Sequence, residues 1–175
     1  MKGFLKIFSF VPALAMMYLI FSFSAQTGTD SSALSHKVAY KIVQVYEIVT
    51  DTEFSPDQVD HYVERLQYPV RKLAHMSEYF LLAICVSLPG YVYGLRGLPL
   101  LFVAGGICVA FAAGDEYHQS SVAGRGPSVK DVCIDSIGVF FGVTLVRIIC
   151  WIALTPSRIA KRARRRARAK AREHR

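Results

Sequence analysis

Ionisable and amide side chains gather near the ends of three apolar segments in this sequence of 175 residues. Charges at a membrane boundary are costly, so they mark either function or compulsory ion pairing. The residues suited to acid–base chemistry are His75, Glu78, Asp115, Glu116, His118 and Gln119. Those suited to holding a charged substrate are Arg71, Lys72, Arg125, Ser128, Asp131 and Asp135.

Helical phase predicts that several of these side chains share a face. Arg71, His75 and Glu78 fall within an arc of roughly 60° if the segment that contains them is helical. Asp115 and Gln119 lie one turn apart if the third apolar helix continues to Gln119.

The fourth apolar segment carries its acids on its packing face. Asp131 and Asp135 are one turn apart, and Gly138 and Gly142 continue the same stripe as a GxxxG motif. Because such a motif lets two membrane helices approach closely, we expect both acids to point into the bundle.

One hypothesis is an enzyme that acts on a lipid-linked precursor or a lipid headgroup. His75 or His118 would be the general base. Glu116 or Asp115 would orient that base or act as an acid, and Arg125 would hold an anion. No serine or cysteine lies in a nucleophile motif, and no HExxH-like spacing occurs. We therefore expect neither a covalent intermediate nor a metal or other cofactor.

Two non-catalytic hypotheses remain open. The same pocket could bind a headgroup or a partner protein without changing it, or the cluster could be an ion network that only fixes helix packing. The charges that would neutralise one another in that network are Arg71, Lys72, Arg125, Glu78, Asp115, Glu116, Asp131 and Asp135. A transporter is disfavoured, because four helices are few for alternating access.

The elements that must position these residues are membrane helices. The chain is 53% hydrophobic, with a mean hydropathy of +0.31 and only 19% charged residues. Four apolar runs, about 4–23, 73–93, 98–114 and 132–154, can each span a bilayer, which needs roughly twenty residues per helix. The predicted fold is therefore an all-α integral membrane bundle of four transmembrane helices.

The connection between the first two runs is expected to contain short amphipathic helices. Apolar residues recur at helical spacing at Leu34, Val38, Ile42, Val45 and Val49. The run Ser55-Pro56-Asp57-Gln58 predicts the start of a second helix, which Tyr68-Pro69 would end. These helices either lie on the outer leaflet or form a lid over a site.

Lysine and arginine predict the orientation. Lys2, Lys6 and Arg96 flank one set of helix ends, whereas the connection 24–72 is rich in acids. Both termini are therefore expected in the cytoplasm of a multi-pass protein of the bacterial cytoplasmic membrane. The alternative that the first run is a cleaved signal peptide leaves the same loops outside.

Two regions follow from the charge distribution: a transmembrane domain, 1–156, and a basic tail, 157–175. The tail holds ten Lys and Arg residues and one acid, so the net charge of +8 for the chain becomes −1 without it. We expect the tail to bind anionic inner-leaflet lipid in the cytoplasm, and we expect no specific nucleic-acid partner.

Several of these pieces resemble the VanZ-like family of membrane proteins. In order, they are Phe23-Ser24-Ala25-Gln26, Arg71-Lys72-Leu73-Ala74-His75 with Glu78-Tyr79, Asp115-Glu116-Tyr117-His118-Gln119, and Arg125 with Ser128, Asp131, Asp135 and Gly138. The resemblance spans about Phe4 to Leu154 and adds Gln26 to the candidate substrate-binding residues.

The resemblance implies a bacterial cell-envelope protein, and the founding member of the family is associated with resistance to the glycopeptide teicoplanin. It supplies no established reaction. The expected function is thus an outward-facing pocket that binds or acts on a lipid-linked or headgroup substrate, with an effect on glycopeptide susceptibility. The expected partners are membrane lipids, including a lipid-linked envelope precursor.

Overall fold

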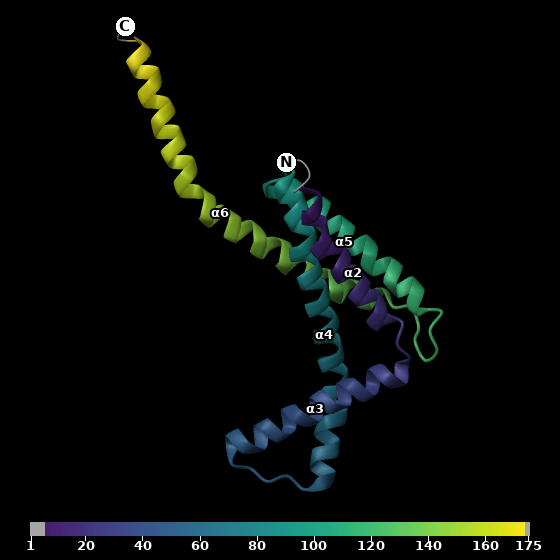
Figure 1. Ribbon diagram of the computed structural model, residues 1–175. Coiled ribbons are helices and arrows are strands. Elements are labelled where there is room, and N and C mark those ends of the chain that lie inside the picture. Colours follow the sequence, from purple (N-terminus) through teal and green to yellow (C-terminus); the bar gives the residue numbers. More distant parts are fainter. Residues whose placement is uncertain (1–5, 174–175) are drawn as a thin grey trace.

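A computed structural model describes residues 6–173 of the chain, with side chains for residues 6–153. Every regular element in this part is helical (Figure 1). The elements are η1 (Phe8–Phe10), α2 (Val11–Ser24), α3 (Gly28–Thr50), α4 (Pro56–Val92), α5 (Gly97–Gln119) and α6 (Val129–Glu173). The predicted all-helical class is confirmed.

Three helices are long and apolar enough to cross a membrane. They are α4, α5 and the Val129–Ala153 part of α6. The segment Phe8–Ser24 qualifies only together with α3, from which it is separated by a bend of 102°. The described chain therefore has three such helices, or up to four if the bent pair forms one span.

Helix α4 is one continuous helix of 37 residues. Its start is the predicted one: the Ser55 hydroxyl accepts the Gln58 amide N–H, and the Gln58 side chain accepts the Ser55 amide N–H. The prediction that Tyr68-Pro69 ends this helix is wrong, because Pro69 lies inside α4.

Packing against α3 explains why the proline does not end α4. Val63, before the proline, and Val70, after it, both belong to an apolar cluster with Ala39 and Val43 of α3. This contact holds the backbone helical on both sides of Pro69, although proline removes one backbone hydrogen bond. At about 1.5 Å per residue, α4 is about 55 Å long, well beyond the roughly 30 Å of a hydrocarbon core.

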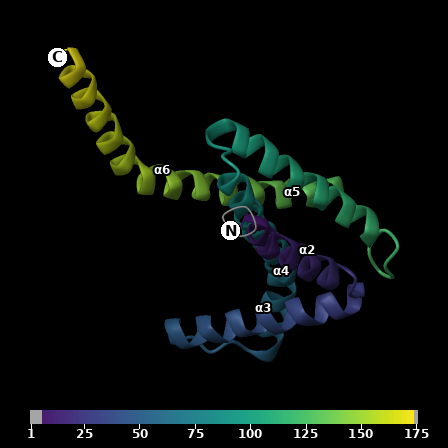
Figure 2. The ribbon, with the colours of Figure 1, turned by 45° about the horizontal axis from the view of Figure 1, so that its top comes forward.

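Helix α3 lies across the N-terminal part of α4 (Figure 2). It occupies the segment in which apolar residues recur at helical spacing, and the Thr27 hydroxyl caps its start by accepting the Asp30 amide N–H. Ser35, Ala39 and Val43 are buried at intervals of four residues, while Leu34, Val38 and Ile42 stay exposed on a neighbouring face.

Helices α5 and α6 both run further than the apolar runs that predicted them. α5 continues past 114 to Gln119, which the placement of Asp115 and Gln119 on one face required. α6 does not end at the predicted boundary near 154 but continues to Glu173. The side chains of the basic tail lie outside the described residues.

The glycine stripe of α6 packs closely on another helix, as predicted, and that helix is α4. A Cβ atom at Gly142 would lie 2.5 Å from the Phe80 carbonyl oxygen, and one at Gly138 would overlap the Met76 carbonyl oxygen. Only glycine permits this approach, and it places the acids of α6 against α4.

The candidate site residues gather at one of the two ends of the bundle. The described N-terminal residues and the turn between α4 and α5 lie at one end, and the loop 120–128 and the start of α3 lie at the other (Figure 1). The candidate site residues are at the second end.

Candidate functional site

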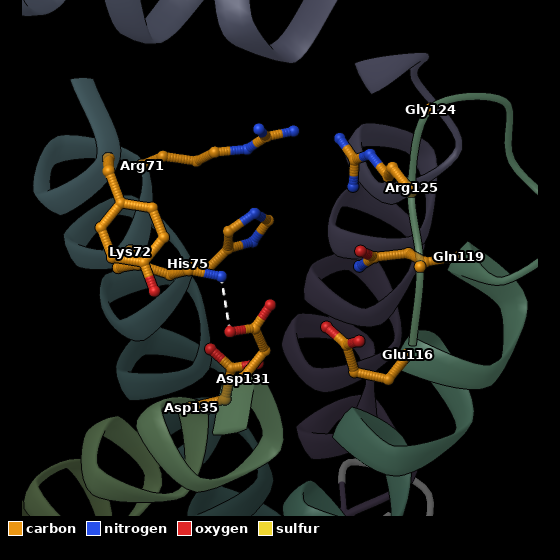
Figure 3. Close-up of a pocket in the computed structure, with 11 residues that line it drawn as sticks. Arg71, Lys72, His75, Glu116, Gln119, Gly124, Arg125, Asp131 and Asp135 are labelled. Atoms are coloured by element: carbon orange, nitrogen blue, oxygen red, sulfur yellow. Dashed lines mark ion pairs between the residues drawn. The ribbon is translucent and has the colours of Figure 1, made fainter. Parts of the chain in front are cut away.

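A cavity of about 190 Å³ lies between α4, α5, α6 and the loop 120–128 (Figure 3). It is lined by Tyr68, Arg71, Lys72, His75, Glu116, Gln119, Gly124, Arg125, Gly126, Asp131 and Asp135. Three helices and one loop thus bring eight of the predicted site residues together around a single space.

Two arginines face each other across this cavity. Figure 3 shows the guanidinium groups of Arg71 and Arg125 pointing toward one another from opposite walls. Among the described side chains, neither guanidinium lies within ion-pair distance of a carboxylate. Arg71 makes one long hydrogen bond of 3.5 Å to the Ser32 hydroxyl, and the Nε of Arg125 is buried without a hydrogen-bond partner.

The electrostatics of Arg125 reflect this arrangement. Burial lowers the pKa of its guanidinium, and the nearby positive charge of Arg71 lowers it further, while Asp115, Glu116 and Glu78 act in the opposite direction. An arginine pKa starts so high that the group stays charged at neutral pH. Two positive charges therefore face each other across the cavity. An anion bound between them would neutralise both guanidinium groups.

The loop that carries Arg125 is fixed by a close backbone contact with α3. The amide N–H of Gly28 donates to the Ala123 carbonyl at 3.2 Å. A Cβ atom at Gly28 would lie 2.6 Å from the Gly124 carbonyl oxygen, and Gly124 itself has a φ of +75°, which favours glycine. The glycines at both positions therefore hold Arg125 over the cavity.

Figure 3 shows the carboxylates of Glu116, Asp131 and Asp135 on the side of the cavity away from the two guanidinium groups. Glu116 accepts the Ser128 amide N–H at 2.9 Å, and the Ser128 hydroxyl in turn accepts the Asp131 amide N–H at 3.3 Å. Asp131 pairs with the Lys72 ammonium at 2.5 Å. Asp135 is only 5% exposed and lies at the base of the same wall.

His75 lies between the two charged sides. Its Nδ1 is 3.4 Å from Oε2 of Glu78, one helical turn further along α4. Glu78 does not line the polar cavity, so it contacts the cavity only through His75. The two groups are within ion-pair distance when His75 is protonated, but Oε2 of Glu78 has no hydrogen-bond partner among the described residues.

A second cavity adjoins the first. It has a volume of about 370 Å³ and lies between α3 and α4, with Gln26 and Glu78 among its lining residues. Arg71, His75 and Arg125 line both cavities. We call the second cavity the α3 groove; most of its other walls are apolar.

Comparison with known proteins identifies the family. The VanZ/LLP1 family matches residues 9–151, which include every residue that lines the two cavities. The chain belongs to the VanZ-like family. No curated protein and no solved structure matched it.

A second predicted acid of this VanZ-like protein, Asp115, also does not line the polar cavity. Asp115 is 4% exposed, and its Oδ2 accepts hydrogen bonds from the Ser24 hydroxyl at 2.7 Å and from the Gln119 amide at 3.0 Å. The Gln119 amide also donates to the Ser24 oxygen at 2.5 Å. We call these three residues the α2–α5 clasp, because they join the end of α2 to the end of α5.

The second candidate base also lies elsewhere. His118 stacks on the ring of Phe21 in α2, with ring centroids 4.3 Å apart, and does not line either cavity. Of the two predicted histidines, the structure brings only His75 to the polar cavity.

Sequence reasoning missed four participants of the VanZ-like site. Tyr68, Gly124 and Gly126 line the cavity, and Ser24 completes the clasp. The pair of glycines on either side of Arg125 was the available signal for a tight loop, whereas nothing local showed that Ser24 would meet Asp115. Among the described residues, no group of three or more His, Cys, Asp and Glu side chains has a metal-binding arrangement.

Proposed function

We propose that this VanZ-like protein binds the phosphate-bearing headgroup of an envelope lipid in the polar cavity. The observation that carries the proposal is the pair of guanidinium groups of Arg71 and Arg125, which face the cavity with no carboxylate partner among the described side chains. Guanidinium groups match phosphate oxygens in geometry and charge.

The cavity has the size of a headgroup. At about 190 Å³ it falls below the roughly 300–1,000 Å³ that accommodates a drug-sized ligand. A glycopeptide or a complete lipid-linked precursor therefore does not fit inside it. An effect on teicoplanin susceptibility would arise indirectly, through the lipids that the protein binds.

The ion-network alternative explains only part of the cluster. Lys72 and Asp131 form a pair, so that contact can serve packing alone. Arg71 and Arg125 form no such pair within the described residues, and both side chains are only half-buried. Ligand binding gives a reason for their presence that packing does not.

The proposed topology has four spans with both termini in the cytoplasm. The segment Phe8–Ser24 would be the first span, with α3 on the outer surface. The turn between α4 and α5, with Arg96, then lies at the same end as the N-terminus and the start of the basic tail. The polar cavity accordingly faces outward from the cytoplasmic membrane of a bacterium.

Catalysis is a second candidate, favoured by the contact between His75 and Glu78 beside the phosphate-binding arginines. Water would attack the phosphorus of the bound ester and give a proton to His75, the P–O bond to the alcohol would break, and the alcohol would leave with the proton that His75 returns to it. The test is to incubate the reconstituted protein with a lipid extract and look for products by mass spectrometry. If wild type forms products and a folded His75→Gln variant forms none, the protein is an enzyme. If the lipids stay intact with both proteins, catalysis is excluded and the binding proposal alone stands.

The binding proposal is tested by titrating glycerol phosphate into the protein in phosphatidylcholine nanodiscs. Loss of one charge-assisted contact costs about 1.5–3 kcal/mol, so Arg125→Gln should lower affinity about tenfold or more. Arg65→Gln is the control, because Arg65 is an exposed arginine of α4 outside both cavities. Equal binding by wild type and Arg125→Gln would refute the proposal.

The link to teicoplanin is tested in cells. Strains that express wild type, Arg125→Gln or Arg65→Gln at equal membrane levels are compared for teicoplanin susceptibility and lipid composition. We expect the wild type and Arg65→Gln to agree and Arg125→Gln to resemble cells without the protein. Identical susceptibility in all strains would remove the link and leave the binding proposal to be decided by the titration.

A further inference from the structure

The α3 groove has apolar walls that are open to the surroundings of the protein. Leu34, Val38 and Ile42 of α3 form one wall, and Leu73 of α4 and Phe23 of α2 contribute to the others. Each of these side chains is 44–60% exposed. The groove exists because α3 turns by 102° from the preceding helix and crosses α4.

The groove and the polar cavity meet at charged groups. Arg71, His75 and Arg125 line both spaces, so an apolar channel of about 370 Å³ ends at two guanidinium groups without ion-pair partners among the described side chains. A single ligand that fills both spaces must be apolar at one end and anionic at the other.

We infer that the α3 groove holds an acyl chain of a membrane lipid whose phosphate lies between Arg71 and Arg125. This inference rests on the proposed function and names its substrate class, a lipid phosphate. A protein helix in the groove would cover the apolar walls but would leave the arginines without a counter-charge. A lipid covers the apolar walls with its acyl chain and neutralises the arginines with its phosphate.

The groove also gives the lipid a route into the site. Three exposed apolar residues of α3, Leu34, Val38 and Ile42, line the groove, as expected for an amphipathic helix at the surface of the hydrocarbon layer. An acyl chain can therefore slide sideways between α3 and α4 without crossing water. The phosphate then reaches the arginines at the level of the headgroups.

The test is photo-cross-linking in phosphatidylcholine nanodiscs. The probe is phosphatidic acid with a diazirine in one acyl chain, and the cross-linked residues are mapped by mass spectrometry. We expect cross-links in 34–42 of α3 and 73–77 of α4, suppressed at least tenfold by excess unlabelled phosphatidic acid. A diacylglycerol with the same diazirine should give at least tenfold fewer cross-links in these segments.

Two tryptophan variants provide a matched comparison. Val38→Trp fills the groove and should lower the suppressible cross-linking about tenfold. Val49→Trp introduces the same side chain on the same helix, at a valine that is 77% exposed and lines neither cavity, and should leave the cross-linking unchanged. Both sites are exposed, so both variants are expected to fold.

The outcomes separate this inference from the proposed function. If glycerol phosphate binds through Arg125 but the cross-links are equal for both probes, unaffected by competitor or unchanged in Val38→Trp, the groove inference is wrong and the headgroup site stands. If glycerol phosphate does not bind but acyl-chain cross-links remain suppressible by phosphatidic acid, the arginine site is wrong. Cross-linking to a co-purified protein in place of lipid would also overturn the inference.

Discussion

The α2–α5 clasp and the polar cavity lie at the same end of the bundle and use similar residues differently. In the clasp, Oδ2 of a buried aspartate, Asp115, accepts two hydrogen bonds from side chains of α2 and α5. In the cavity, Arg71 and Arg125 face open space without ion-pair partners among the described side chains. Under the proposed function, the buried acid of the clasp serves helix packing, whereas the two arginines of the cavity serve a ligand.

The largest expected change in stability comes from breaking the clasp. Asp115→Ala leaves Ser24 and Gln119 with unsatisfied buried groups, which should cost about 1–3 kcal/mol of unfolding free energy. Thermal denaturation in nanodiscs measures this loss, and Asp60→Ala, at an exposed acid of α4, is the control. The folded Asp115→Ala protein should still bind glycerol phosphate. Normal stability with lost binding would instead place Asp115 in the ligand site.

A carboxylate of the cavity should respond in the opposite way. Asp135 is buried, and no hydrogen bond to its carboxylate is found among the described residues, so Asp135→Asn should leave stability unchanged or raise it by up to about 1 kcal/mol. Asp131→Asn is the matched comparison, because it breaks the pair with Lys72 and should cost about 1 kcal/mol. Equal destabilisation of both variants would show that the cavity wall is as structural as the clasp.

The two histidines should separate an effect on binding from an effect on stability. His75→Gln should weaken glycerol phosphate binding several-fold, because His75 lines both cavities. His118→Gln should leave binding unchanged and cost about 0.5–1.5 kcal/mol through loss of the stack on Phe21. The same titration and denaturation measurements apply to both. Weaker binding in His118→Gln alone would reverse the assignment.

The sequence was sufficient for features set by local periodicity. Three of the four apolar runs correspond to helices apolar enough to span a membrane, the capping pattern at Ser55 predicted the start of α4, and helical phase placed Arg71 and His75 on one wall. The glycine stripe of α6 predicted a close contact with another membrane helix, although not that this helix would be α4.

Features that depend on contacts distant in sequence could not be predicted. α4 passes through Pro69 because α3 packs on both sides of it, which no local pattern encodes. Asp115 and His118 turn toward α2, because the end of α2 presents Ser24 and Phe21 at their level. Helix phase gave the faces of α5 but not which neighbour would meet each face.

The central claim is that Arg71 and Arg125 serve a ligand and not the fold. It is tested by the thermal stability of wild type and of the Arg71→Gln, Arg125→Gln double variant in phosphatidylcholine nanodiscs, with and without phosphatidic acid. Removal of two mutually repelling charges should leave the variant at least as stable as wild type in the absence of phosphatidic acid, and phosphatidic acid should stabilise wild type alone. A double variant that is strongly destabilised without phosphatidic acid, or stabilised by it as much as wild type, would contradict the account.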